Sequence, residues 1–412
     1  MTRNFFVLVA TGLFILVSSE VIAQTSNAGA GKLDRLTQIM PDAKAGSCAA
    51  IVVSTSIPLV HTAQVLPLSA DGAVVAPSDV SQQVRQAFAN LERTLAAANS
   101  SLRQVVKLNV YVREPSVSLE VQQWLANTFM GKSFPAVSFV QTKLPVTEAL
   151  LAFDAVAGTG EANVEKIVLG DAAKYAPSSA AAYGILPAGP RVFISGQAEK
   201  GDGTLADATL KTLESLASSL KFCGLDTKDV VQLKAFCLPM TEAAVVEQVV
   251  KKFFAGRTAP PLILVEWKSN LPIEIELIAT APPRNEKAPN VEFLTPPDLK
   301  PSPIFSRITR VSSPKIIYVS GIYTGKPGQA AADEVRALFP RLKEILAEGR
   351  SDLEQMVKAT YYVADGEVSA LLNKTRPDFY HPQRPPAASK AEVAGSGREG
   401  HRITIDMIAV PK

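Results

Sequence analysis

The chain has 412 residues, a formal net charge of +3 and 47% hydrophobic residues. At roughly 150 residues per domain, this length suggests about three domains, and the composition is that of a globular protein. The small net charge and the lack of any Lys/Arg run argue against a dedicated nucleic-acid binder.

The N-terminus has the layout of a secretory signal peptide. A short basic start over residues 1–4 precedes an apolar stretch over 5–19, and Val21-Ile22-Ala23 places compact residues before a cleavage site at Gln24. An uncleaved membrane anchor is the alternative, but the apolar run falls short of the roughly 20 residues that span a bilayer. We therefore expect a signal peptide over 1–23 and a small, polar, flexible tether over 24–34. The mature protein is expected to be exported, periplasmic or secreted, with no membrane association after cleavage.

One apolar strand pattern occurs three times. Val106, Val231 and Val357 are equivalent, with offsets of 231 − 106 = 125 and 357 − 231 = 126 residues. Pro-rich strand starts and apolar strands with one acid follow each copy at matching places. A period this long is a whole domain rather than a solenoid unit. The expected domains are 35–158, 163–281 and 290–412.

Each copy predicts the same order of elements. A β-hairpin comes first, followed by an amphipathic helix whose apolar residues recur every three or four positions. Asn99, Gly224 and Gly349 stand at the helix ends, where a left-handed residue is expected. A central strand, a second helix and two closing strands complete an α+β layer. The second helices are expected near 118–129, 241–254 and 366–376, the last stopped by Pro377.

Cysteine and histidine give little indication of a site. For Cys48, Cys223 and Cys237, two interpretations are open: buried unpaired thiols, or a disulfide in an oxidising compartment. His61, His381 and His401 have no ligand spacing, so we expect no metal and no cofactor.

These landmarks resemble the RidA family, also called YjgF or L-PSP. The resemblance rests on the Ser195-Gly196-Gln197 strand end, the Val-Val-Lys strand, the Pro-Ala-x-Ser turn and the closing strand Ile273 to Ala279. It implies a chorismate-mutase-like fold in which homotrimers form small-molecule pockets at their subunit interfaces. The family activity is hydrolysis of 2-imino acids and enamines to 2-oxo acids and ammonia, without a cofactor. Three copies in one chain then predict a pseudo-trimer that is monomeric as a chain; three unpacked domains on a string are the alternative.

The family arginine that grips the substrate carboxylate is replaced by an aliphatic residue in every copy. Val137, Leu262 and Ala388 occupy its place, with Ser138 and Ser389 following in copies one and three. Arg384 lies near the turn of copy three, but in the wrong register. The loss of a charged hydrogen-bonding partner argues against the conventional deaminase activity.

The resemblance assigns the water-orienting carboxylate to Asp154, Glu276 and Asp406, and the small hydroxyl of the pocket wall to Thr62, Ser195 and Ser320. A carboxylate in a partly dry cleft can act as a general base; an acid held in an ion pair is the open alternative.

We therefore expect an exported protein with small-molecule pockets between its repeats, which binds a ligand or hydrolyses an imine or enamine without a carboxylate. A non-catalytic structural or holdase-like pseudo-trimer and a conventional 2-iminobutanoate/2-iminopropanoate deaminase are the alternatives. If the protein is an enzyme, we expect a hydrolase or deaminase.

Overall fold

The computed structural model describes residues 36–130, 133–161, 163–171, 180–282 and 289–412. The predicted signal peptide and tether lie outside these residues. Within them the chain repeats one series of elements three times, β-β-β-α-β-α-β-β, so the predicted α+β class with three tandem domains is confirmed.

The elements of the three domains correspond one to one. Domain 1 contains β1 (Leu36–Asp42), β2 (Ser47–Ser54), β3 (Leu59–Thr62), α2 (Val80–Ala97), β4 (Val105–Val112), α3 (Pro115–Phe129), β5 (Ala136–Gln141) and β6 (Leu151–Gly158). Domain 2 contains β7 (Val168–Gly170), β8 (Tyr183–Leu186), β9 (Arg191–Gln197), α4 (Leu205–Phe222), β10 (Val230–Cys237), α5 (Ala243–Phe253), β11 (Leu262–Glu266) and β12 (Ile273–Thr280). Domain 3 contains β13 (Val291–Leu294), β14 (Ile308–Val311), β15 (Lys315–Val319), α6 (Ala331–Glu348), β16 (Met356–Val363), α7 (Gly366–Thr375), β17 (Ala387–Glu392) and β18 (Ile403–Ala409).

The long helices end as predicted in two domains of three. Asn99 and Gly224 adopt left-handed φ angles of 52° and 74°. In domain 3 the prediction was off by one residue, because Gly349 has φ −82° and Arg350 takes the left-handed place with φ 56°. Gly349 has a different reason to be glycine: a Cβ there would lie 2.9 Å from the Ile317 side chain.

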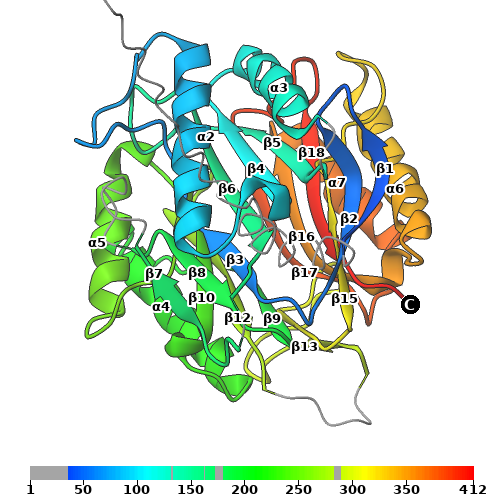
Figure 1. Cartoon of the computed structure of the whole chain (residues 1–412). Helices are drawn as coiled ribbons and strands as arrows, with labels where there is room; N and C mark the ends of the chain where they lie inside the picture. Colours follow the sequence, from blue (N-terminus) through cyan, green and yellow to red (C-terminus); the bar gives the residue numbers. More distant parts are fainter. Residues whose placement is uncertain (1–35, 131–132, 162, 172–179, 283–288) are drawn as a thin grey trace, which may run out of the picture. The chain divides into compact units, whose positions relative to one another are not determined.

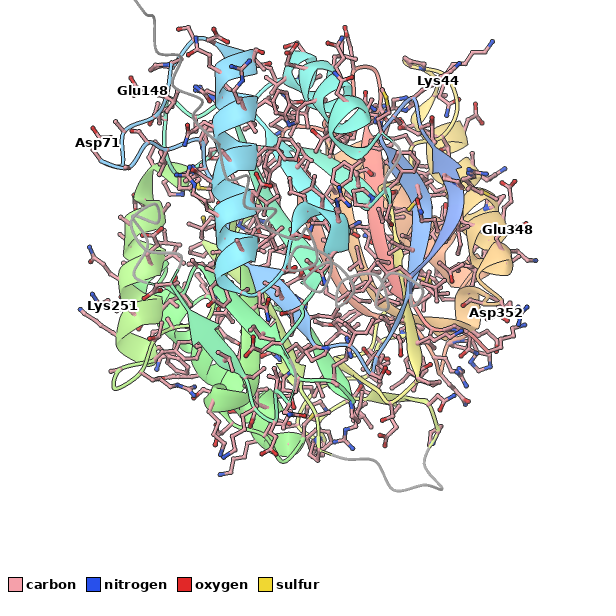
Figure 2. All side chains as sticks on the ribbon, viewed as in Figure 1. Lys44, Asp71, Glu148, Lys251, Glu348 and Asp352 are labelled. Carbon is pink, nitrogen blue, oxygen red and sulfur yellow. The ribbon has the colours of Figure 1, made fainter. Side chains whose placement is uncertain are left out.

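The helices cover the outside of the sheets, and the inner sheet faces pack against one another (Figure 1). Each domain buries one apolar core between its helices and a sheet to which the neighbouring domain also contributes strands. Charged side chains such as Lys251, Glu348 and Asp352 point outward from the surface (Figure 2). A second set of charged residues lies instead between the domains, and it is described below with the functional site.

The N-terminal hairpins of the domains are exchanged around a ring, through the second strand of each. β8 of domain 2 pairs with β3 of domain 1, β14 of domain 3 pairs with β9 of domain 2, and β2 of domain 1 pairs with β15 of domain 3. A β-hairpin does come first in each copy, formed by β1 with β2, β7 with β8 and β13 with β14. The strand expected to end that hairpin (β3, β9 or β15) pairs instead with the hairpin of the next domain, so this part of the prediction is wrong. The exchange closes the three domains into one ring, as domain swapping does between separate chains.

A proline before the third strand of each domain explains why that strand does not pair with the strand before it. Pro58, Pro190 and Pro314 stand directly before β3, β9 and β15. Proline has no N–H for a tight turn and holds the residue before it in an extended conformation. The chain therefore continues away from its own preceding strand and leaves that strand to the neighbouring domain.

The described residues contain no disulfide: Cys48, Cys223 and Cys237 are buried and unpaired. Burial raises the pKa of Cys48 and of Cys237 to about 12, so both thiols stay protonated. Within the described parts of the chain, no helix is both long enough and apolar enough to span a bilayer.

Candidate functional site

The domains meet along three seams. Seam 1–2 is where Ala63 and Gln64 of domain 1 face Leu262 of domain 2, and seam 2–3 is where Ser195 and Gly196 face Ala388. In seam 3–1, Ser320 and Gly321 of domain 3 face Val137 of domain 1. The sequence prediction placed its pockets in these seams.

Strand register corrects one predicted site residue. His61, Phe193 and Tyr318 pair with the equivalent residues Val156, Ile278 and Ile408, and are therefore equivalent themselves. The residues two positions after these are therefore equivalent too, so Ala63 of domain 1 corresponds to Ser195 and Ser320 of the other domains. The hydroxyl of Thr62 is one position away and accepts a hydrogen bond from Ala155 N–H within its own domain (2.9 Å).

Ser195 and Ser320 link the domains across their seams. The Ser195 hydroxyl accepts from Ala388 N–H (2.7 Å) and donates to the Ser306 carbonyl (2.5 Å). The Ser320 hydroxyl accepts from Val137 N–H (2.7 Å) and donates to the Cys48 carbonyl (2.6 Å). Both hydroxyls are thus committed to the backbone on both sides, which fixes the seam rather than leaving a free nucleophile.

Seam 1–2 is closed. Gln64 occupies the position of Gly196 and Gly321, and its amide donates to the Leu264 carbonyl (3.1 Å). Leu262 and the neighbouring Ile263 are buried. A long side chain thus stands where Gly321 leaves space beside the seam 3–1 pocket and where Gly196 makes room for the Glu274 carboxylate.

The three predicted catalytic acids meet in a single axial cluster instead of lying in three separate clefts. The acids and three lysines surround a cavity of about 50 Å³, which is large enough for water. The axial cluster consists of Asp154, Glu276, Asp406, Lys107, Lys234 and Lys358.

Ion pairs in the axial cluster join different domains. Lys107 Nζ of domain 1 lies 2.8 Å from Asp406 Oδ1 of domain 3. Lys358 Nζ of domain 3 lies 2.6 Å from Glu276 Oε2 of domain 2. Asp154 accepts from Asn109 (3.1 Å) and from the Tyr111 hydroxyl (2.6 Å). These acids are committed to ion pairs and hydrogen bonds, which agrees with the open alternative of the sequence reading.

Burial and the neighbouring charges together set the pKa values in the axial cluster. Burial raises the pKa of Asp154, and Lys234, Tyr111 and Asn109 oppose that rise. Burial alone lowers the pKa of Lys234, but Tyr362 and the three acids outweigh it and the net direction is upward. With three ammonium groups facing three carboxylates, the cluster has no formal excess charge.

Glu274, which the sequence reading did not select, lies in seam 2–3. It stands two residues before Glu276 on β12, and a Cβ at Gly196 would collide with its carboxylate. Burial raises the pKa of Glu274 to about 7, against a lowering hydrogen bond from Ser389 of domain 3. The equivalent residues of the other domains are Ala152 and Thr404. The sequence Ile-Glu-Ile-Glu contains both acids, but only the second has an acidic counterpart in the other two copies. The repeat therefore predicts Glu276 and not Glu274 as a site residue.

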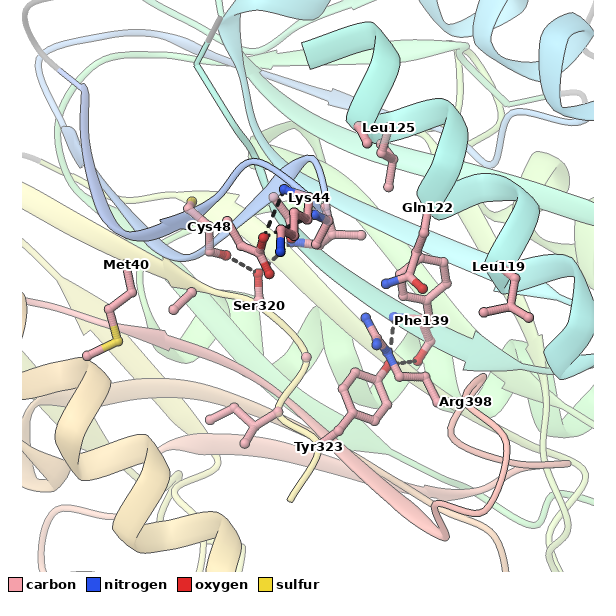
Figure 3. A pocket seen from close by; sticks show the side chains of 18 of the residues that line it. Met40, Lys44, Cys48, Leu119, Gln122, Leu125, Phe139, Ser320, Tyr323 and Arg398 are labelled. Atoms are coloured by element: carbon pink, nitrogen blue, oxygen red, sulfur yellow. Dashed lines mark hydrogen bonds between the residues drawn. The ribbon is translucent and has the colours of Figure 1, made fainter. Parts of the chain in front are cut away.

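Seam 3–1 contains an open pocket of about 990 Å³ (Figure 3). Val137, Ser320 and Gly321 line it together with Phe139, Tyr323 and Arg398. Figure 3 shows Arg398 beside Tyr323 and Phe139, with Met40 at the opposite side. A guanidinium group is therefore present in this seam although the strand position expected for the family arginine holds Val137.

The other predicted binding residues have clear environments. Ser138 accepts a hydrogen bond from Lys107 Nζ (2.7 Å) and so belongs with the axial cluster. The Ser389 hydroxyl accepts from Gly196 N–H (3.1 Å) across seam 2–3. Arg384 donates to the Glu354 carbonyl (3.2 Å) and stacks over Phe293, outside the residues that line the seam 3–1 pocket.

Comparison with known proteins agrees with this architecture. The family model described as "Endoribonuclease L-PSP" matches three times, over residues 45–158, 173–281 and 298–411. A RutC family protein, UK114 of Drosophila melanogaster, is 30% identical over 109 residues, which are 26% of this chain and 78% of that protein.

Solved structures match one domain's length at a time. A protein of unknown function of the conserved Rid family from Yersinia pestis is 26% identical, covering 30% of this chain and 98% of that chain with a TM-score of 0.28. Yeast Mmf1 is also 26% identical, with the same coverage and a TM-score of 0.23. On the three family-model matches, the chain belongs to the Rid (YjgF, endoribonuclease L-PSP) family and carries three copies of its domain in series.

Proposed function

We propose that this chain is an exported Rid-like protein that binds a small molecule in the pocket of seam 3–1. The observation that carries the proposal is that pocket, about 990 Å³ in volume and lined by Ser320, Gly321 and Val137. Concave pockets of roughly 300–1,000 Å³ are typical of small-molecule sites. Export is proposed from the layout of residues 1–23, and mass spectrometry of the mature N-terminus from the host tests it: Gln24 is expected, and intact Met1 contradicts it.

Binding without turnover is favoured in this pocket because no residue of its described lining is placed as a general base. Thr404 stands where seam 2–3 has Glu274. Asp42 lines the pocket, but its carboxylate accepts from the N–H groups of Lys44 (2.9 Å) and Ala45 (3.2 Å). A general base must reach the proton that it removes, and Asp42 is exposed and already engaged in a turn.

A thermal-shift screen of organic anions, amines and neutral amides tests the proposal. Ala126 lines the pocket on α3, so Ala126→Trp is expected to fill it and abolish any ligand-induced stabilisation. Ala347→Trp, at an exposed position on α6, is the matched control and should respond like the wild type. A ligand that stabilises wild type and Ala126→Trp equally would place the binding site elsewhere and contradict the proposal.

Hydrolysis of an imine or enamine in seam 2–3 is the second candidate function. Glu274 supports it, because a carboxyl with a pKa of about 7 can exchange a proton with water at neutral pH. Lys390, on the same strand as Ala388, adds positive charge near Glu274. Water would add across the C=N bond and ammonia would leave.

An imine-hydrolysis assay separates the two candidates. If seam 2–3 is catalytic, Glu274→Gln abolishes turnover, whereas Glu348→Gln on the exposed face of α6 leaves it unchanged. Turnover that survives Glu274→Gln removes seam 2–3 as the catalytic site. Absence of both turnover and ligand binding would favour the non-catalytic, structural or holdase-like pseudo-trimer.

A further inference from the structure

We propose that the seam 3–1 pocket takes an organic carboxylate with an apolar body, and that Arg398 holds the carboxylate. The inference rests on the proposed binding function and names the chemical class of its ligand. It assigns the anion contact to the loop between β17 and β18 of domain 3. The strand position that Val137 occupies supplies no cation.

Arg398 is held by two aromatic rings from different domains. Its guanidinium carbon lies 4.6 Å from the ring centre of Tyr323 and 5.4 Å from that of Phe139. Cations are attracted to aromatic faces at such distances. The Tyr323 ring is fixed in turn, because its hydroxyl accepts from Phe139 N–H (3.1 Å).

The loop that carries Arg398 is fastened to domain 1. Gln141 N–H donates to the Gly395 carbonyl (2.9 Å), and the Ser118 hydroxyl donates to the Gly397 carbonyl (2.5 Å). Gly397 has φ 76°, and a Cβ there would lie 2.8 Å from the Phe139 side chain. The arginine is therefore positioned before any ligand arrives, which lowers the ordering cost of binding.

Part of the hydrogen-bonding capacity of Arg398 remains unused, although its guanidinium group also interacts with the Tyr323 hydroxyl. Among the described residues, no ion pair involves Arg398, and its buried Nε has no hydrogen-bond partner. Arg341 lines the same pocket, but Glu344 lies 2.5 Å from its Nη1 and Met40 Sδ lies 3.5 Å from its Nη2. Leaving a buried donor unpaired costs free energy, and a carboxylate matches the planar fork of a guanidinium.

The remaining lining suits an apolar ligand body. The pocket extends from Arg398 past apolar side chains of both domains, and a small oxo acid would leave most of its volume empty. These side chains are Leu119, Leu125, Ile322 and Ile345. Basic residues also outnumber acidic ones in the lining, with Lys44, Arg341 and Arg398 against Asp42. Both features favour an anion that carries a hydrocarbon group.

Isothermal titration with 4-phenylbutanoate and its neutral analogue 4-phenylbutanamide tests the inference on the full mature chain. Wild type is expected to bind the carboxylate about 10- to 100-fold more tightly than the amide, as one charged hydrogen-bonding pair implies. Arg398→Gln should erase that preference while amide binding stays unchanged, and Arg398→Lys should keep part of it. Arg336→Gln, at an exposed position of α6 outside the pocket lining, is the matched control and should shift either dissociation constant by less than about threefold.

Four results would overturn the inference. Equal affinity of the wild type for acid and amide would show that the charge is not recognised. Unchanged carboxylate preference in Arg398→Gln would assign the contact to another residue. Failure of both probes to bind a wild type that other compounds stabilise would reject this ligand class but leave the binding function in place, whereas binding that persists in Ala126→Trp would reject the pocket itself.

Discussion

Lys358 Nζ lies 2.6 Å from Glu276 Oε2, and the two residues come from domains 3 and 2. Both side chains are about 6% exposed, so the pair is shielded from solvent and salt. Ion pairs of this kind contribute little net stability but are costly to break, because one charge is left buried without its partner.

Lys358→Met is therefore expected to lower the free energy of unfolding by about 3–5 kcal/mol in urea titrations. The double variant Lys358→Met/Glu276→Leu removes both charges and should recover most of that loss. Lys343→Met on the exposed face of α6 is the control. A single variant within about 0.5 kcal/mol of this control would contradict the role given to the axial cluster.

Ser195→Ala tests the bridging role of the seam hydroxyls. The change leaves Ala388 N–H and the Ser306 carbonyl without their partner, which should cost about 1–3 kcal/mol. Ser218→Ala, at an exposed position of α4, should stay within about 0.5 kcal/mol of wild type. Equal effects of the two substitutions would mean that the Ser195 hydroxyl does not hold seam 2–3.

The sequence predicted the fold well because its signals are local and repeated. The helical periodicity around Leu213 or Leu338 depends only on nearby residues. The same holds for the pattern of the central strand, which occurs in all three copies. The exchange of the N-terminal hairpins depends on strand pairing between domains, and the periodicity of a sequence does not predict such pairing. One local feature indicated this exchange. A proline stands at the same place in each copy, directly before β3, β9 or β15, namely Pro58, Pro190 and Pro314.

The site was harder to predict because homologous positions diverged in different directions. Asp154, Glu276 and Asp406 are equivalent, but their shared place faces the central axis, where lysines from neighbouring domains neutralise them. The seams differ at positions where only one copy has a functional group, such as Glu274. Arg398 was invisible to a comparison of copies, because its loop has no counterpart of similar sequence in domains 1 and 2.

Glu274 is expected to make stability depend on pH near neutrality. Its folded pKa of about 7 lies above the ordinary glutamate pKa of 4.5, so between these pH values the folded state binds the extra proton. Stability from this group is therefore present at low pH and is lost as pH rises through about 7. Glu274→Gln should gain stability relative to wild type between pH 5 and pH 8 in denaturant titrations.

The exposed Glu348→Gln variant provides the baseline for this comparison and should show no such relative gain. A constant difference between Glu274→Gln and wild type across that range would mean that the carboxyl is already ionised at pH 5. The proton-transfer role proposed for seam 2–3 would then lose its support.

The exchanged strands predict a compact single chain in solution. A mature chain starting at Gln24 should sediment as a monomer, with a radius of gyration of about 21 Å by small-angle scattering. Separate domains on flexible linkers would give a clearly larger radius. A particle with the mass of three chains would instead show that the three domains of one chain do not bury one another's interfaces.

Binding stoichiometry tests the central claim most directly. Among the described residues, Gln64 occupies seam 1–2 and the Glu274 carboxylate lies against Gly196 in seam 2–3, whereas seam 3–1 holds the large pocket. Titration of the mature chain with 4-phenylbutanoate should therefore give one site per chain, and that site should disappear in Ala126→Trp. Three equivalent sites per chain, or one site that survives Ala126→Trp, would contradict the account.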